Sequence, residues 1–463
     1  MIFRFIILFF GFLQVPLFAN ITSLKTQNNL DIILFHEPKV PLVTIVLVSK
    51  AGAMTETKDI NGLTHLWEHM FFKGNAKLPN QEAFTRRIRQ LGIVFNGDTS
   101  SEMVRYYFTL PAEFLAEGLE FMSDAIISPL LEQNELERER KVVLDEYDRA
   151  ASKPNFDFYN VTRHLMYGAE EFRRNALGDR VLIEKATKEQ LLRIKDEVFV
   201  PDNSAILISG AFDPSKVPAL VDRFFSRWKK PENWKPVVIP EIDPKTFKSS
   251  EFIMTRPLVQ NAQVFINYRG PTTRDQKTDT YTADVLTTIL SSRSGEFYKQ
   301  IVDSGVALDA SLSYHTQSRS GELVLFALAE PAKLTTVRER LKNEILLWQS
   351  PKTFARYFSE QKLSDAKKKI KIQYELELNK PSETIKNLAF WWAVGGLNYY
   401  ENYLTGISHV TLKNISDFVG KYFAGQTSFS SALLSIEDAK KFNIQDTSKD
   451  FSKKFLQNQE IKQ

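Results

Sequence analysis

The segment from Ile60 to Phe72 constrains this chain more than any other, because it places two histidines and a glutamate in a largely apolar stretch of helical length. His65 and His69 are two of only 6 histidines in the chain and stand at positions i and i+4. Such positions lie on one face of a helix, so both imidazoles can reach a single cation. Glu68 belongs to the same turn and can hold a metal-bound water without being a ligand. Because buried imidazole and carboxylate groups are costly unless they are paired or metal-bound, the segment predicts a metal site.

A third protein ligand, as a catalytic zinc ion usually requires, is expected on the acidic helix predicted from Glu132 to Ala150. At about 100° per residue, Leu136, Val142 and Val143 lie on its inward face. Glu139 and Glu146 fall within the same apolar stripe, and helical phase alone does not choose between them. The alternative for either glutamate is a solvated helix whose carboxylates are bound by basic residues.

The composition limits which ligands and partners the site can have. The chain has no cysteine, so metal ligands must come from His, Asp and Glu. Its formal net charge is only +4 over 463 residues and no concentrated basic run is present, which argues against a nucleic-acid partner. A content of 43% hydrophobic residues is ordinary for a globular protein, and the length allows about two to four domains.

The first residues of the chain differ in kind from the rest. Arg4 precedes an almost wholly apolar run from Phe5 to Val15, and the segment ends with Pro-Leu-Phe-Ala at residues 16–19. This pattern predicts a secretory signal peptide cleaved near Ala19, and hence an exported protein that is periplasmic or secreted. An uncleaved membrane anchor is the alternative, although the run is short for a span. No second apolar run approaches a spanning length, so no stable membrane span is expected after cleavage.

The second half of the chain repeats the order of elements predicted for the first half. Residues 186–191 followed by 204–209 resemble residues 410–415 followed by 429–435. The second half has no counterpart of the two-histidine segment, which predicts one metal site per chain. The predicted organisation is a signal peptide at 1–19, an N-terminal metal-binding domain at 20–230, a linker rich in Pro and Lys at 231–248, a homologous domain without metal at 249–455 and a tail at 456–463.

The order His-x-x-Glu-His at positions 65–69 is the inverted zincin motif. With its surroundings it resembles the pitrilysin/insulinase family of zinc peptidases, in particular the two-domain branch that is similar to mitochondrial processing peptidase. Glu146 stands 77 positions after His69, where the family places its third zinc ligand, and Glu139 matches a second glutamate that supports the site. The resemblance implies an α+β fold of two homologous α/β-sandwich domains, each a mixed, largely antiparallel sheet with helices packed on it.

The resemblance also implies an activity and a set of roles. His65, His69 and Glu146 would hold one Zn²⁺ per chain, although the residues themselves do not choose zinc over manganese or cobalt. Glu68 would act as general base and acid, and Glu139 would support a ligand histidine. The implied activity is zinc-dependent endopeptidase cleavage of peptides or unfolded segments, inside a closed chamber that two such chains form. A zinc-bound but proteolytically inactive scaffold is the alternative, and a packed histidine pair without metal is a third interpretation.

Two further positions compare the chain with the family's substrate contacts. The family binds substrate beside an edge strand that carries Asn-Ala, and the match here is Asn96-Gly97. The competing interpretation is an ordinary turn that starts at Asn-Gly, after a strand at residues 94–96. The family's second domain usually carries an Arg–Tyr pair, but Val302 and Leu308 stand at those positions. We therefore expect a dimer, either with a homologous subunit that supplies the Arg–Tyr pair or with a second copy of this chain.

Overall fold

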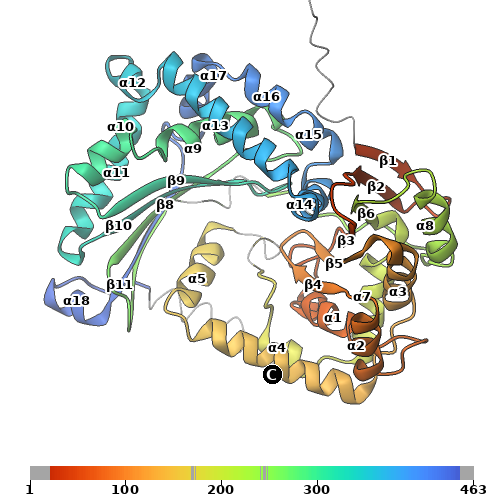
Figure 1. The fold of residues 1–463 in the computed structure, drawn as a ribbon. Coiled ribbons are helices and arrows are strands. Elements are labelled where there is room, and N and C mark those ends of the chain that lie inside the picture. Colours follow the sequence, from red (N-terminus) through yellow and green to blue (C-terminus); the bar gives the residue numbers. More distant parts are fainter. Residues whose placement is uncertain are drawn as a thin grey trace, which may run out of the picture.

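The computed structural model describes residues 21–167, 172, 174–239, 241–242, 247 and 249–448. The predicted signal peptide and C-terminal tail lie outside these residues. The described chain forms two sheets, each packed with helices (Figure 1), which confirms the expected α+β class with two homologous domains. The domain boundaries given above stay predictions.

The first sheet has six strands in the order β1-β2-β6-β3-β5-β4, and the second has five in the order β7-β11-β8-β10-β9. The first-sheet strands are β1 (Ile21–Lys25), β2 (Asp31–His36), β3 (Leu42–Ser49), β4 (Val94–Thr99), β5 (Val104–Pro111) and β6 (Ser204–Gly210). The second-sheet strands are β7 (Ser250–Arg256), β8 (Ala262–Arg269), β9 (Asp309–His315), β10 (Glu322–Ala329) and β11 (Ser428–Ser435).

The two sheets share one pairing pattern, as a duplication predicts. In each sheet one pair is parallel, β2 with β6 and β7 with β11, and the remaining pairs are antiparallel. The helix before each returning strand also starts alike, because Thr187 and Thr411 both form a capping box with the residue three positions later. By this correspondence β4 and β9 are matching edge strands.

The helices of the first half are α1 (Leu63–Phe71), α2 (Gln81–Gln90), α3 (Leu115–Ile127), α4 (Gln133–Ala151), α5 (Phe156–Met166), α6 (Arg180–Glu184), α7 (Lys188–Val198) and α8 (Val217–Phe225). Those of the second half are α9 (Lys277–Leu290), α10 (Glu296–Tyr298), α11 (Leu334–Gln349), α12 (Pro351–Tyr357), α13 (Glu360–Leu378), α14 (Pro381–Val394), α15 (Leu397–Glu401), α16 (Tyr403–His409), α17 (Leu412–Tyr422) and α18 (Ile436–Lys441).

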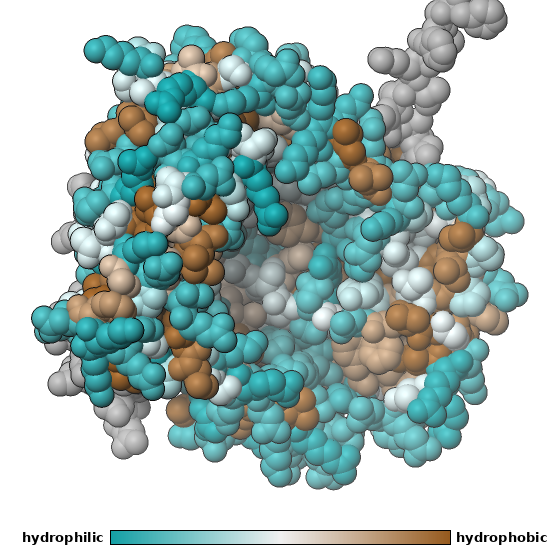
Figure 2. Space-filling model, turned by 60° about the vertical axis from the view of Figure 1, so that its left-hand side comes forward, coloured by the Kyte–Doolittle hydropathy of each residue, from teal (hydrophilic) through white to brown (hydrophobic). Residues whose placement is uncertain are grey.

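One helix of each domain packs on the sheet of the other domain. Helix α14 contacts β3 and β6, where Leu388 joins a core cluster that includes Val46 and Leu207 of the first sheet. Helix α5 lies against the second sheet, where the ring of Phe158 packs on Phe252 and Phe265 (Figure 1). Because apolar side chains of both halves share these clusters, the two domains stabilise each other. A hollow remains between them on the face seen in Figure 2.

Two local expectations are wrong. Val142 of α4, expected on the inward face, is 42% exposed, whereas Leu136 and Val143 are fully buried. Val142 lies at the edge of the apolar stripe of α4, so its side chain faces solvent although that of the next residue, Val143, is buried. The expected turn from Gly97 is the second error, because β4 continues to Thr99 in register with β5. The ion pair between Asp98 and Arg105, at 2.6 Å, supports this extra pairing.

Replacing Leu388 by Ala should lower the free energy of unfolding by about 2–5 kcal/mol, because its fully buried side chain fills the contact between α14 and the first sheet. Urea unfolding, followed by tryptophan fluorescence, measures the change. Leu376→Ala is the matched control, since Leu376 is 61% exposed and its loss should cost less than about 0.5 kcal/mol. Equal stability of the two variants would contradict the packing of α14 described here.

Candidate metal centre and active site

Helix α1 lies between the first sheet on one side and helices α4 and α7 on the other. Its side chains are buried against both. Phe71 stacks on Tyr106 of β5 with ring centroids 3.9 Å apart, and Trp67 stacks on Phe199 at 5.2 Å. These contacts fix the rotation of the helix about its axis. The face that carries His65 and His69 therefore points at α4.

The start of α1 is held by a buried carboxylate that was not predicted. Glu56 accepts hydrogen bonds from the backbone N–H groups of Gly62 at 2.8 Å and Thr64 at 2.9 Å. Helix N-termini expose such N–H groups and favour negative charge. Gly62 has φ of 92° and packs so closely on Gly178 that no side chain fits between them. The chain entering α1 is thereby fixed at the turn before the first histidine.

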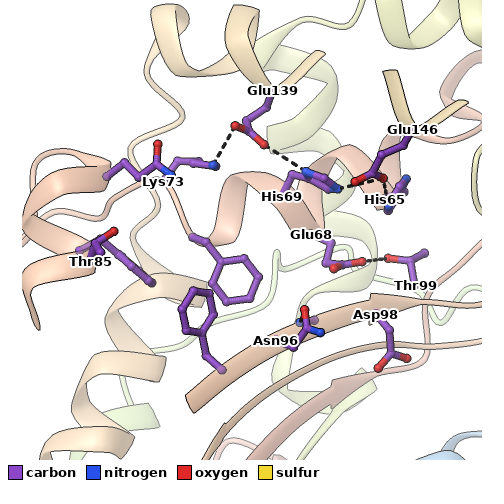
Figure 3. A pocket seen from close by; sticks show the side chains of 15 residues that line it. His65, Glu68, His69, Lys73, Thr85, Asn96, Asp98, Thr99, Glu139 and Glu146 are labelled. Atoms are coloured by element: carbon purple, nitrogen blue, oxygen red, sulfur yellow. Dashed lines mark hydrogen bonds and ion pairs between the residues drawn. The ribbon is translucent and has the colours of Figure 1, made fainter. Parts of the chain in front are cut away.

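The structure brings His65, His69 and Glu146 together (Figure 3), with one donor atom of each within 4.8 Å of the others. The Nε2 atoms of both histidines lie 3.7 Å from Oε2 of Glu146. Glu139 lies on the opposite side of the His69 ring, where its Oε2 accepts a hydrogen bond from Nδ1 at 3.0 Å. The folded structure thus distinguishes the two glutamates, which helical phase could not do: Glu146 faces the Nε2 atoms of both histidines, and Glu139 faces Nδ1 of His69. Two imidazole nitrogens and one carboxylate oxygen are a donor set that fits a zinc ion with an open position.

The pKa values of His65 and Glu68 suit such a site. Burial, together with the charge of His69, lowers the pKa of His65 to about 4, so this ring is neutral at pH 7 and free to bind a cation. Burial raises the pKa of the Glu68 carboxyl to about 7, although the hydroxyl of Thr99 donates to its Oε2 at 2.7 Å. A carboxyl group whose pKa lies near neutrality can both accept and release a proton.

The edge strand β4 forms the floor of the site. Asn96 and Gly97 pair with Tyr107 and Tyr106 of β5, so they lie within the strand and not at a turn. A side chain at Gly97 would approach Oε1 of Glu68 to 2.7 Å, which shows how closely the strand passes beneath this carboxyl. A cavity of about 500 Å³ opens over these residues, and its apolar wall consists of Phe72, Phe84 and Phe95.

Three neighbours of the site were missed from the sequence. Thr99 was placed in a turn, and Glu56 lay in a polar connection with no pattern that marked it. Lys73 ends 2.8 Å from Oε1 of Glu139. Its position four residues after His69, within the segment whose surroundings resemble the family, is the signal that could have found it. Val302 lies in a short π-helical segment (Lys299–Asp303) and Leu308 is half-exposed before β9. Neither of these positions compared with the Arg–Tyr pair lines the cavity above β4.

A His–His–Glu cluster on α1 and α4, beside an edge strand of one of two homologous domains, is a candidate metal site. Two family models match the chain, "Insulinase (Peptidase family M16)" over residues 31–182 and "Peptidase M16 inactive domain" over residues 185–370. The chain therefore belongs to the pitrilysin/insulinase family of peptidases, as its sequence motif indicated.

Relatives of the chain carry peptidase names. It is 24% identical over 328 residues to an uncharacterized zinc protease of Rickettsia felis, covering 70% of this chain and 77% of the relative. It is 28% identical over 207 residues to the probable mitochondrial-processing peptidase subunit beta of Schizosaccharomyces pombe, covering 44% of each. The structure of a protease from Helicobacter pylori superposes with a TM-score of 0.78 at 19% identity, covering 89% of this chain and 99% of the other.

None of the helices in the described part of the chain is long and apolar enough to cross a membrane.

Replacing Glu56 by Ala should lower the free energy of unfolding by about 1–3 kcal/mol, because two buried N–H groups lose their acceptor. Amide hydrogen exchange over residues 60–72 should rise with it, as the start of α1 opens. Glu82→Ala is the control, because the Glu82 side chain is 83% exposed on α2. Unchanged stability and unchanged exchange in the Glu56 variant would contradict the capping role.

Proposed function

We propose that this chain is a zinc-dependent endopeptidase that hydrolyses peptides or unfolded protein segments. The observation that carries the proposal is the convergence of His65, His69 and Glu146, with Glu68 beside them and an edge strand below. The first three residues would hold one Zn²⁺. A scaffold has no use for a buried carboxyl group poised at the same cavity, which favours catalysis over simple metal binding.

The residues divide the work of peptide hydrolysis among them. When bound, zinc supplies a Lewis acid and lowers the pKa of a water ligand. Glu68 would take a proton from the attacking water and deliver it to the leaving nitrogen, a role that suits a carboxyl group whose pKa is raised to about 7. Substrate adds as a strand beside Asn96 and Gly97, so that backbone pairing brings its carbonyl over Glu68. The aromatic wall of the cavity accepts an apolar side chain next to the cleaved bond.

The active form is a dimer in which a homologous partner supplies the Arg–Tyr pair. Val302 and Leu308 cannot grip a substrate carbonyl by hydrogen bonds or charge, because their side chains are hydrocarbon. The similarity to a subunit named as one of a processing peptidase supports this arrangement. The hollow between the two domains (Figure 2) gives each chain one half of an enclosing surface.

A zinc-bound, proteolytically silent subunit is the second candidate function. The Val302 and Leu308 positions favour it, since they remove two substrate contacts. We propose that either form acts outside the cytoplasm, because the apolar run from Phe5 to Val15 predicts a signal peptide that is cleaved near Ala19.

Glu68→Gln should leave zinc bound and abolish peptide cleavage, whereas His69→Ala should lose both. Zinc content by elemental analysis and cleavage of an unfolded fluorogenic peptide, with and without a chelator, measure the two effects. His409→Ala, at an exposed position of α16, should change neither. Full cleavage by the Glu68 variant would refute the proposed chemistry. Zinc binding without cleavage in the wild-type protein and its complexes would favour the silent subunit.

The purified chain alone should cleave slowly, and a homologous chain that lacks the zinc motif but carries the Arg–Tyr pair should raise the rate. The expected gain is about tenfold or more, the size of one charge-assisted hydrogen bond to substrate. Mixing the purified chains at increasing partner concentration measures it. A chain that reaches the full rate by itself, with no response to the partner, would contradict the division of labour.

A further inference from the structure

Lys73 follows the last turn of α1 and reaches back to the metal centre (Figure 3). Its Nζ lies 2.8 Å from Oε1 of Glu139, while Oε2 of the same carboxylate lies 3.0 Å from Nδ1 of His69. Only 14% of the Lys73 side chain and 6% of the Glu139 side chain are exposed. Each carboxylate oxygen of Glu139 therefore has its own hydrogen-bond partner. Both partners lie largely out of contact with solvent, where charge-assisted hydrogen bonds are strong.

The Nδ1 atoms of the two histidines have different surroundings. The Nδ1 atom of His69 has Glu139 as its partner, whereas Nδ1 of His65 is buried without a hydrogen bond among the described residues. The chain therefore fixes the tautomer and ring orientation of one histidine only. Whatever holds Glu139 in place also sets the direction in which the Nε2 lone pair of His69 points.

The charges also need Lys73. Glu68, Glu139 and Glu146 bring three carboxyl groups to one site, two of them buried and Glu146 36% exposed, and one divalent cation balances only two negative charges. Lys73 supplies the remaining positive charge. Without it, Oε1 of Glu139 would be a buried anionic oxygen that has lost its partner, and turning toward the cation would offset that cost.

We propose that Lys73 is a positioning residue that keeps Glu139 outside the metal coordination sphere and aimed at His69. The inference rests on the proposed zinc site. It assigns to a residue outside the motif a part in distinguishing two glutamates that share one stripe of α4: Glu146 binds the metal, and Glu139, held by Lys73, orients a ligand.

The test compares Lys73→Met, which keeps the length of the side chain and removes its charge, with Lys73→Arg and with Lys77→Ala. Lys77 is a nearby lysine whose partners, Glu120 and Asp124, lie away from the site. Zinc affinity is measured by competition with a chelator. The visible absorption of the cobalt(II)-substituted protein reports coordination number, because four-coordinate cobalt(II) absorbs more strongly than five- or six-coordinate cobalt(II).

Lys73→Met should weaken zinc binding by about 10- to 100-fold and reduce the cobalt(II) absorption, as Glu139 enters the coordination sphere. Lys73→Arg should restore both values, and Lys77→Ala should match the wild type. In a Glu139→Gln background, Lys73→Met should have no further effect on the spectrum, which separates an action through Glu139 from simple misfolding.

Wild-type affinity and spectrum in Lys73→Met would overturn this inference alone. So would a weaker affinity with an unchanged spectrum, or a spectral change that persists unaltered in the Glu139→Gln background. A wild-type protein that binds neither zinc nor cobalt would overturn both the inference and the proposed function.

Discussion

The contact between α1 and α4 concentrates more charge than a helix pair can bury unaided. Two imidazoles and the carboxylates of Glu68, Glu139 and Glu146 meet there, and desolvating such groups is costly unless each finds a partner. The structure supplies Thr99 for Glu68 and Lys73 for Glu139. The two Nε2 atoms and Glu146 are left facing one another, and a divalent cation is the partner that we propose for them. The rest of the fold keeps these groups in place.

The domain without the metal cluster contributes to that support. Its helix α14 covers the first sheet, and Arg105 of β5 links the two halves by donating to Asp98 of β4 at 2.6 Å and to the backbone carbonyl of Lys386 in α14 at 2.7 Å. The turn after β4 makes a second connection, since Glu102 accepts the N–H of Ser318 at 2.9 Å. The edge strand beneath Glu68 is thus braced from the other domain, which gives the second half a structural role in the site.

Much of this arrangement could be predicted from the sequence, and the failures have physical reasons. The spacing of His65 and His69 is a local helical property, so the sequence alone pointed to one shared face. Which of Glu139 and Glu146 faces the Nε2 atoms depends on how far α4 is shifted along α1. This shift is set by tertiary packing, and the helical phase of the α4 sequence does not determine it. The turn expected at Gly97 reflected the local preference of Asn-Gly, which pairing with β5 overrides. Glu56, Thr99 and Lys73 act through contacts made only after folding.

Anomalous diffraction at the zinc absorption edge, from crystals of the zinc-loaded protein, tests the central claim most directly. We predict one peak per chain. The ion at this peak should bind Nε2 of His65, Nε2 of His69 and a carboxylate oxygen of Glu146. Glu139 should form a hydrogen bond with His69 and should not bind the ion. A peak at other residues, or a Glu146 carboxylate turned away from an ion held by the two histidines alone, would contradict it.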